Sequence, residues 1–136
     1  MIVIDCSSLV HFLLGRSPVA TKIRERIAQE DILAAPGLID YEITSAVFGL
    51  ARGRNPKITA REAVKAIGDF NSLAIDRHAT LVLWERVRKL SDNLSTYDAH
   101  YVALAETLGA PLITSDDKIR KAGAARCEIE VFASGS

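Results

Sequence analysis

The sequence has few of the features that mark secreted, membrane or disulfide-stabilised proteins. Its 136 residues include two cysteines, Cys6 and Cys127, which are too few for a disulfide framework and have no His or Cys neighbour at metal-ligand spacing. No basic leader precedes the apolar N-terminus, and no apolar run approaches the ~20 residues that cross a bilayer. We therefore expect reduced thiols, a cytoplasmic location and no membrane partner.

An excess of one charge sign is also missing, because 17 basic and 17 acidic residues cancel. The whole chain therefore does not point to a nucleic-acid partner. Between residues 52 and 65, however, five cations face a single acid. Within this basic segment Arg52, Arg54 and Lys57 are candidate contacts for RNA or for an acidic partner, although such runs are usually solvated helix faces.

Two common catalytic motifs are absent as well. The chain has no glycine-rich phosphate loop of the Walker or Rossmann type. It also has no Gly-x-Ser-x-Gly motif that would expose a serine nucleophile. Chemistry at this protein's site must therefore come from other side chains.

What is present is an alternation of short apolar runs with longer amphipathic stretches, in a chain long enough for one domain. The runs predict strands over residues 2–4, 32–35, 73–75, 112–114 and 129–132. Helices are predicted over residues 9–14 with a serine cap, and over 19–30, 38–52, 60–71, 79–90, 96–108 and 117–122. This alternation predicts an α/β domain over residues 1–132, with a parallel sheet flanked by helices on both faces. Residues 133–136 are expected to form a flexible tail.

Four carboxylates are predicted to lie at one edge of that sheet. Asp5 follows the first strand, Glu42 lies in the first turns of a helix, Asp98 opens another helix, and Asp116 follows the fourth strand. In α/β domains ligands bind at the carboxyl edge of the strands. Four acids need a counter-charge there, and oxygen-only ligands favour Mg²⁺ or Mn²⁺. The sequence thus indicates a metal-dependent enzyme of phosphoryl chemistry.

Each of the four acids also has a simpler interpretation as a helix cap or first-turn residue. Asp5 is surplus to capping if a following serine caps the helix, and Glu42 lies beside an apolar stripe, where a charge costs desolvation. Asp98 fits a capping box, and Asp116 stands beside Asp117, an auxiliary candidate because one of the pair must cap the next helix. The functional interpretation depends on all four acids meeting at one edge.

The runs at residues 2–10, 94–105 and 108–119, with Glu42 in an otherwise apolar helix, resemble the PIN-domain nucleases. Length and order are most similar to the VapC toxins of bacterial and archaeal toxin–antitoxin pairs. The resemblance implies a five-stranded parallel sheet and a magnesium- or manganese-dependent endoribonuclease. The family's acidic quartet and its auxiliary polar positions match Asp5, Glu42, Asp98 and Asp116, with Ser7 and Ser115.

The resemblance also implies a mechanism and partners. Three of the carboxylates would hold one metal ion, and Asp116 would complete its shell or help a second ion. Metal-activated water would then attack the RNA phosphodiester. Family members usually form homodimers, and heterotetramers or larger assemblies with a VapB-type antitoxin whose tail enters the acidic cleft. The basic segment would guide the RNA backbone or bind an acidic antitoxin tail.

Three alternatives stay open at the level of sequence. A receiver-like phosphoacceptor domain would place its acidic pair at the first strand, whereas the pair here is Asp116 and Asp117. A binding module would keep the fold and use the acids only as caps. A PIN-type nuclease acting in RNA processing or on DNA would keep the chemistry without a toxin pair.

Overall fold

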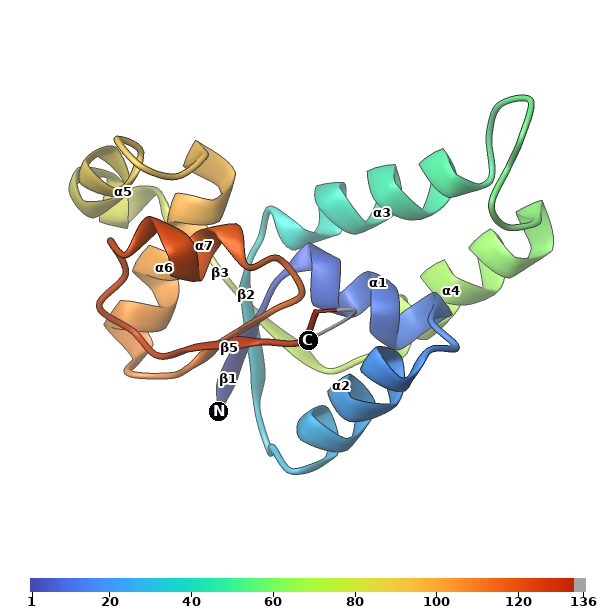
Figure 1. Ribbon diagram of the computed structural model, residues 1–136, viewed down its shortest axis with the longest axis horizontal. Coiled ribbons are helices and arrows are strands. Elements are labelled where there is room, and N and C mark those ends of the chain that lie inside the picture. The colour runs from blue at the N-terminus through green and yellow to red at the C-terminus, as the bar shows by residue number, and fades with distance from the viewer. Residues whose placement is uncertain (134–136) are drawn as a thin grey trace.

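Five parallel strands form the centre of the protein, whose computed structural model describes residues 1–133 (Figure 1). They are β1 (Ile2–Ile4), β2 (Leu33–Pro36), β3 (Ile75–His78), β4 (Leu112–Thr114) and β5 (Ile129–Val131). Their order in the sheet is β3-β2-β1-β4-β5, and each neighbouring pair is parallel. The predicted five-stranded parallel sheet is therefore confirmed.

Helices cover both faces of the sheet, as expected (Figure 1). On one side lie α1 (Cys6–Leu14), α2 (Pro18–Ala28), α3 (Ile39–Leu50) and α4 (Ala60–Ser72). On the other lie α5 (Trp84–Leu90) and α6 (Thr96–Leu108), and the short α7 (Lys118–Ala122) joins β4 to β5. None of the helices within residues 1–133 is long and apolar enough to cross a membrane.

The order of the strands creates a switch point between β1 and β4. The chain first builds outward from β1 to β2 and β3, and then returns to place β4 on the other side of β1. Helices therefore leave the ends of β1 and β4 toward opposite faces, which opens a crevice at the carboxyl edge. Because Ile4 pairs with Ile113, the residues that follow β1 and β4 emerge side by side.

Buried apolar side chains fix the helices that border this crevice. All three residues of β1 are fully buried, as expected for a central strand covered on both faces. In α3 the buried side chains are Ile39, Ile43 and Val47, a stripe spaced by four residues. Burying each such side chain stabilises the fold by about 1.5–3 kcal/mol. Glu42, between the first two, is thereby held at the edge of a core-facing stripe.

The first helix begins at Cys6 instead of residue 9, several other boundaries shift by one or two residues, and two elements differ further from their prediction. The third strand was expected over residues 73–75 but lies at Ile75–His78, because Leu73 still ends α4 through its N–H bond to Phe70. The helix expected over 79–90 begins only at Trp84, after a 3₁₀ turn over Leu81–Leu83. Both boundaries are set by long-range contacts, namely pairing with β2 and a bond between Thr80 and His100 on α6.

Both cysteines are free thiols in the structure. The flexible tail expected over residues 133–136 lies, apart from Ala133, outside the described residues.

Candidate active site

The four predicted carboxylates line one cavity of about 450 Å³ at the carboxyl edge of the sheet. Asp5 and Asp116 follow β1 and β4, and Glu42 and Asp98 lie in the first turns of α3 and α6. The cavity therefore sits at the switch point, where sheets of this kind bind ligands. Its other lining residues are Cys6, Ser7, Val10, Ala46 and Tyr101.

Asp5 is at once a helix cap and a residue of the acidic cavity. Its Oδ1 accepts hydrogen bonds from Ser7 Oγ at 2.8 Å and from the N–H of Ser8 at 3.0 Å, which makes Asp5 the N-cap of α1. The expectation that a serine caps this helix and leaves Asp5 surplus is therefore wrong. Capping fixes the carboxylate where it lines the cavity, so the two roles are compatible.

A small hydrogen-bond network ties the end of β1 to the end of β4. Ser7 Oγ, which donates to Asp5, accepts the N–H of Ser115 at 3.0 Å and lies 3.4 Å from Thr114 Oγ1. Thr114 Oγ1 in turn accepts the N–H of Asp116 at 3.0 Å. Ser115 takes part through its backbone, since its hydroxyl is buried without a partner among residues 1–133. The network sets the two aspartates in a fixed relation.

Glu42 is oriented by a tyrosine that the sequence analysis did not identify. The hydroxyl of Tyr101 on α6 donates to Glu42 Oε1 at 2.6 Å, and the Tyr101 side chain is buried. Burial raises the pKa of Glu42, the tyrosine bond opposes that rise, and the charges of Asp5 and Asp98 add to it. The spacing contained a signal, because Tyr101 follows Asp98 by three residues and so shares its helix face.

Lys118 is the second residue that the sequence analysis missed. Its Nζ lies 3.1 Å from Asp116 Oδ2 and 3.8 Å from Asp98 Oδ2, so its ammonium stands between two of the four acids. Burial would raise the pKa of Asp116, but hydrogen bonds from the Lys118 N–H and ammonium hold it below its usual value. The backbone N–H of Asp98 donates to Ser95 Oγ, while the Asp98 carboxylate faces Lys118.

Two other groups in the cavity, Asp5 and Cys6, have pKa values that are raised by burial. Burial raises the pKa of Asp5 even though the Ser7 hydroxyl and the Ser8 N–H donate hydrogen bonds to its carboxylate. Burial, together with the charges of Glu42 and Asp5, raises the pKa of the Cys6 thiol to about 12. A cation in the cavity would favour the ionised form of each of these groups.

The cavity contains side chains that can bind a metal ion, but they are not arranged around a common point. Within residues 1–133 no three His, Cys, Asp or Glu side chains stand close enough together to hold a metal ion. The carboxylates repel one another, and Lys118 neutralises part of their charge. The available donors are carboxylate and hydroxyl oxygens, which fit Mg²⁺ or Mn²⁺. Binding would require the carboxylates to turn toward a shared ion.

Besides Ser115, which does not line the acidic cavity, four predicted site residues lie outside it. Asp117 pairs with Arg120 at 2.6 Å and Lys121 at 3.4 Å on its own helix. Three cationic residues of the basic segment lie in the loop between α3 and α4, at the end of α3 remote from the sheet (Figure 1). A 12-residue helix is about 18 Å long, which separates that loop from Glu42 by most of the helix. The residues concerned are Arg52, Arg54 and Lys57.

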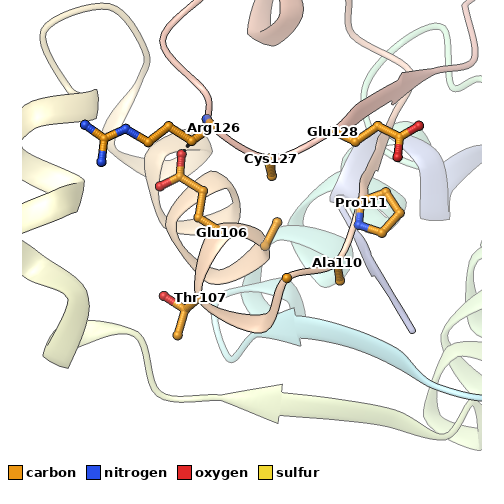
Figure 2. Close-up of a pocket in the computed structure, with 9 residues that line it drawn as sticks. Glu106, Thr107, Ala110, Pro111, Arg126, Cys127 and Glu128 are labelled. Carbon is orange, nitrogen blue, oxygen red and sulfur yellow. Dashed lines mark hydrogen bonds between the residues drawn. The ribbon is translucent and has the colours of Figure 1, made fainter.

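Another cavity, of about 520 Å³, lies at the C-terminal end of α6 (Figure 2). Its side chains do not form a catalytic site. Its best-placed acid, Glu106, already accepts hydrogen bonds from the Arg86 guanidinium and from the N–H of Arg126. Figure 2 shows Thr107 and Glu128 directed away from Glu106. The acidic cavity is therefore the candidate active site.

Comparison with known proteins assigns the family. A model of the PIN domain matches residues 2–125. Ribonuclease VapC9 of Mycobacterium tuberculosis is 37% identical over 131 residues, which cover 96% of this chain and 98% of that protein. Ribonuclease VapC12 of the same species is 31% identical over 133 residues, 98% of this chain and 100% of that protein.

Two solved structures share the fold. PAE2754 from Pyrobaculum aerophilum superposes with a TM-score of 0.64 at 24% identity, covering 96% of this chain and 88% of that one. VapBC2 from Rickettsia felis, bound to a DNA fragment from its promoter, gives a TM-score of 0.66 at 16% identity, covering 96% and 98%. The family match and the near full-length relatives lead to one conclusion: this chain belongs to the PIN-domain family, in the group of the VapC ribonucleases.

Proposed function

We propose that this protein is the endoribonuclease toxin of a VapBC-type toxin–antitoxin pair. One observation carries the proposal: four carboxylates from four separate segments of the chain line one cavity at the switch point of the sheet. The sequence relatives at 37% and 31% identity are named ribonucleases, and they match this chain over almost its whole length. PIN-domain VapC nucleases generally depend on a divalent metal ion.

The carboxylates have distinct tasks in this proposal. Asp5, Glu42 and Asp98 would hold one Mg²⁺ or Mn²⁺ ion, and Asp116 would complete its shell or serve a second ion. A bound divalent ion supplies hydroxide from water and stabilises charge on the phosphate. The chain provides the cavity and the four carboxylates that line it.

Neighbouring residues keep those carboxylates in place. The Tyr101 hydroxyl holds Glu42 Oε1, and the Ser7 hydroxyl bridges the loops that carry Asp5 and Asp116. Lys118 neutralises part of the charge of Asp116 and Asp98, and its exposed ammonium is also suited to bind an RNA phosphate.

No side chain of the cavity is placed to act as the nucleophile. The raised pKa of Cys6 keeps its thiol protonated at neutral pH. The hydroxyl of Ser7 is committed to Asp5 and to the N–H of Ser115. Attack by water is therefore the reaction that this cavity supports, which is hydrolysis of the RNA phosphodiester.

The proposal extends to partners. As its membership of the VapC group implies, this chain pairs with a VapB-type antitoxin and forms homodimers within heterotetramers or larger complexes. Three cations of the basic segment, Arg52, Arg54 and Lys57, lie away from the acidic cavity. They therefore fit a role in binding the antitoxin, or RNA far from the cut, better than a role at the reacting phosphate.

Cleavage of a mixed RNA pool tests the proposal. The wild-type protein is expected to cut the pool with Mg²⁺, to stop cutting in EDTA, and to lose most activity on Asp98→Asn substitution. Failure of the wild type to cut, together with no Mg²⁺ or Mn²⁺ binding by calorimetry, would make the acids structural caps and the protein a binding module.

A further inference from the structure

A groove with exposed aromatic side chains adjoins the acidic cavity. This tyrosine groove has a volume of about 430 Å³. Its lining residues are Cys6, Leu38, Tyr41, Glu42, Ser45, Ala46 and Tyr97. Three of them, Cys6, Glu42 and Ala46, also line the acidic cavity, so the two hollows share a wall. A chain bound over the carboxylates would therefore reach the groove without leaving the surface.

Two tyrosines from different helices give the groove its character. Tyr41 on α3 is 76% exposed and Tyr97 on α6 is 62% exposed, whereas Tyr101 in the neighbouring cavity is buried. Neither tyrosine hydroxyl forms a hydrogen bond with any other part of residues 1–133, so no such bond fixes the position of either ring. The two rings are available to a ligand.

Each exposed tyrosine is directly joined to a carboxylate of the candidate active site. Tyr41 precedes Glu42 and Tyr97 precedes Asp98, so each pair of Cα atoms is about 3.8 Å apart. Because the groove and the acidic cavity also share Cys6, Glu42 and Ala46, a ligand between the rings lies beside the carboxylates. This places the groove where the nucleotide beside the cut must pass.

Charge decides which part of that nucleotide enters the groove. The lining includes one carboxylate, Glu42, and no Lys or Arg side chain. A phosphate would meet only repulsion there, whereas a base is neutral and planar. The groove volume is also within the ~300–1,000 Å³ typical of sites for small organic groups.

We propose that Tyr41 and Tyr97 bind a nucleobase of the RNA next to the phosphodiester that is cut. This inference rests on the proposed ribonuclease function. Proteins bind unpaired RNA by stacking splayed bases on aromatic side chains, and such stacking tolerates any base. The exposed hydroxyl of Ser45 is the groove's remaining polar group and can bond the edge of the base. The substrate is therefore single-stranded RNA at the cleavage site.

Binding of labelled RNA tests the inference directly. The probe is an oligonucleotide of about twelve nucleotides with mixed sequence, titrated in Mg²⁺ by fluorescence anisotropy. An Asp116→Asn background prevents cleavage and leaves the groove intact, since Asp116 is not among its lining residues. Tyr41→Ala and Tyr97→Ala are each expected to weaken binding about 5- to 100-fold, because a stacked ring is lost.

Three controls separate stacking from other causes. Tyr41→Phe and Tyr97→Phe keep the ring and should bind RNA as tightly as the parent. Phe48→Ala removes an exposed ring of α3 outside the groove and should have no effect. An abasic chain of the same length should bind the parent protein weakly, and this comparison needs no alanine variant. The affinity for the abasic chain should also stay unchanged when either tyrosine ring is removed.

In otherwise wild-type protein, loss of either ring should raise KM for RNA cleavage with little change in kcat. The inference is overturned if the abasic chain binds as tightly as the RNA, or if ring loss leaves RNA affinity unchanged in a protein that cuts RNA. Ring loss that changes only the molar mass in solution would instead assign the groove to a contact between copies of this chain. A wild type that neither binds nor cuts RNA would remove the ribonuclease function itself.

Discussion

At the scale of single residues, the candidate active site holds four like-charged carboxylates close together. Asp5 and Glu42 both have raised pKa values, chiefly because they are buried. Each is fixed by a neutral hydroxyl, from Ser7 and Tyr101 respectively, rather than by a salt bridge. Neutral donors orient a carboxylate without competing with a cation for its charge, which suits a site built to receive a metal ion.

Replacing Tyr101 with phenylalanine tests this role of the hydroxyls. The ring stays in the core, but Glu42 Oε1 loses its donor at 2.6 Å. We expect Mg²⁺ affinity and RNA cleavage to fall about 10- to 100-fold, the usual effect of losing a partner that orients a metal ligand. Calorimetry and cleavage rates measure both quantities.

Ser72→Ala is the control, since it removes an exposed hydroxyl at the end of α4 that bonds the Gly68 carbonyl of its own helix and lines neither the acidic cavity nor the tyrosine groove. It should leave Mg²⁺ affinity and cleavage unchanged. If Tyr101→Phe behaved like this control, Glu42 would not depend on Tyr101 for its orientation.

At the scale of helices and strands, local sequence signals determined some boundaries and tertiary contacts determined others. The helix α6 begins and ends where predicted, because Ser95 caps its start and Gly109, with a φ of 63°, ends it. The strand β3 was misplaced because its pairing with β2, rather than its own apolar pattern, selects Ile75–His78. Helix caps can be recognised in the sequence, whereas the register in which β3 pairs with β2 cannot.

The same distinction applies to the site. The four acids were predictable because each follows a strand or opens a helix at the carboxyl edge of a parallel sheet. The bond between Tyr101 and Glu42 joins residues 59 positions apart, and the contact of Lys118 with Asp98 crosses from α7 to α6. Neither follows from spacing alone, since side-chain reach across elements is decided by packing.

The link between α5 and α6 gives a prediction at this scale. Burial would raise the pKa of Glu106, but bonds from the Arg86 guanidinium and the Arg126 N–H hold it below its usual 4.5. A lowered folded-state pKa contributes stability above the unfolded pKa, and this contribution is lost as pH falls through the folded value. Glu106→Gln should therefore lower the free energy of unfolding by about 1–3 kcal/mol at neutral pH.

Urea unfolding at several pH values measures this difference. The gap between wild type and Glu106→Gln should shrink as the pH falls below about 4.5. Asp69→Asn, which breaks the exposed pair with Lys65, should change stability little at any pH. A gap for Glu106→Gln that persisted undiminished at acidic pH would show that the carboxylate charge is not its source.

At the scale of the whole molecule, a chain of zero net charge concentrates negative charge at one point of its fold. The strand order brings residues 5, 42, 98 and 116 to one cavity, where Lys118 forms ion pairs with two of them. Repulsion in that cavity opposes folding, and an ion bound only by the folded state stabilises it. The metal is thus expected to contribute to stability as well as to chemistry.

Thermal unfolding with and without metal checks this expectation. Mg²⁺ or Mn²⁺ at about 100 times its Kd should add about 2.7 kcal/mol to the free energy of unfolding and raise Tm. KCl at matched ionic strength should have a much smaller effect, and Asp98→Asn should reduce the response to the divalent ion. Equal shifts with KCl and with the divalent ion would indicate general screening instead of a specific site.

Two neighbouring acids allow the most direct test that the carboxylates of the cavity carry the activity. Asp116 lines the cavity, whereas Asp117 is paired with Arg120 and Lys121 outside it. The measurement is the rate of Mg²⁺-dependent RNA cleavage by Asp116→Asn and Asp117→Asn, each compared with wild type. We predict that Asp116→Asn loses about 100-fold or more, a loss comparable to that from other metal-site changes, while Asp117→Asn stays within about threefold. Equal losses in both variants, or full activity in Asp116→Asn, would contradict the account.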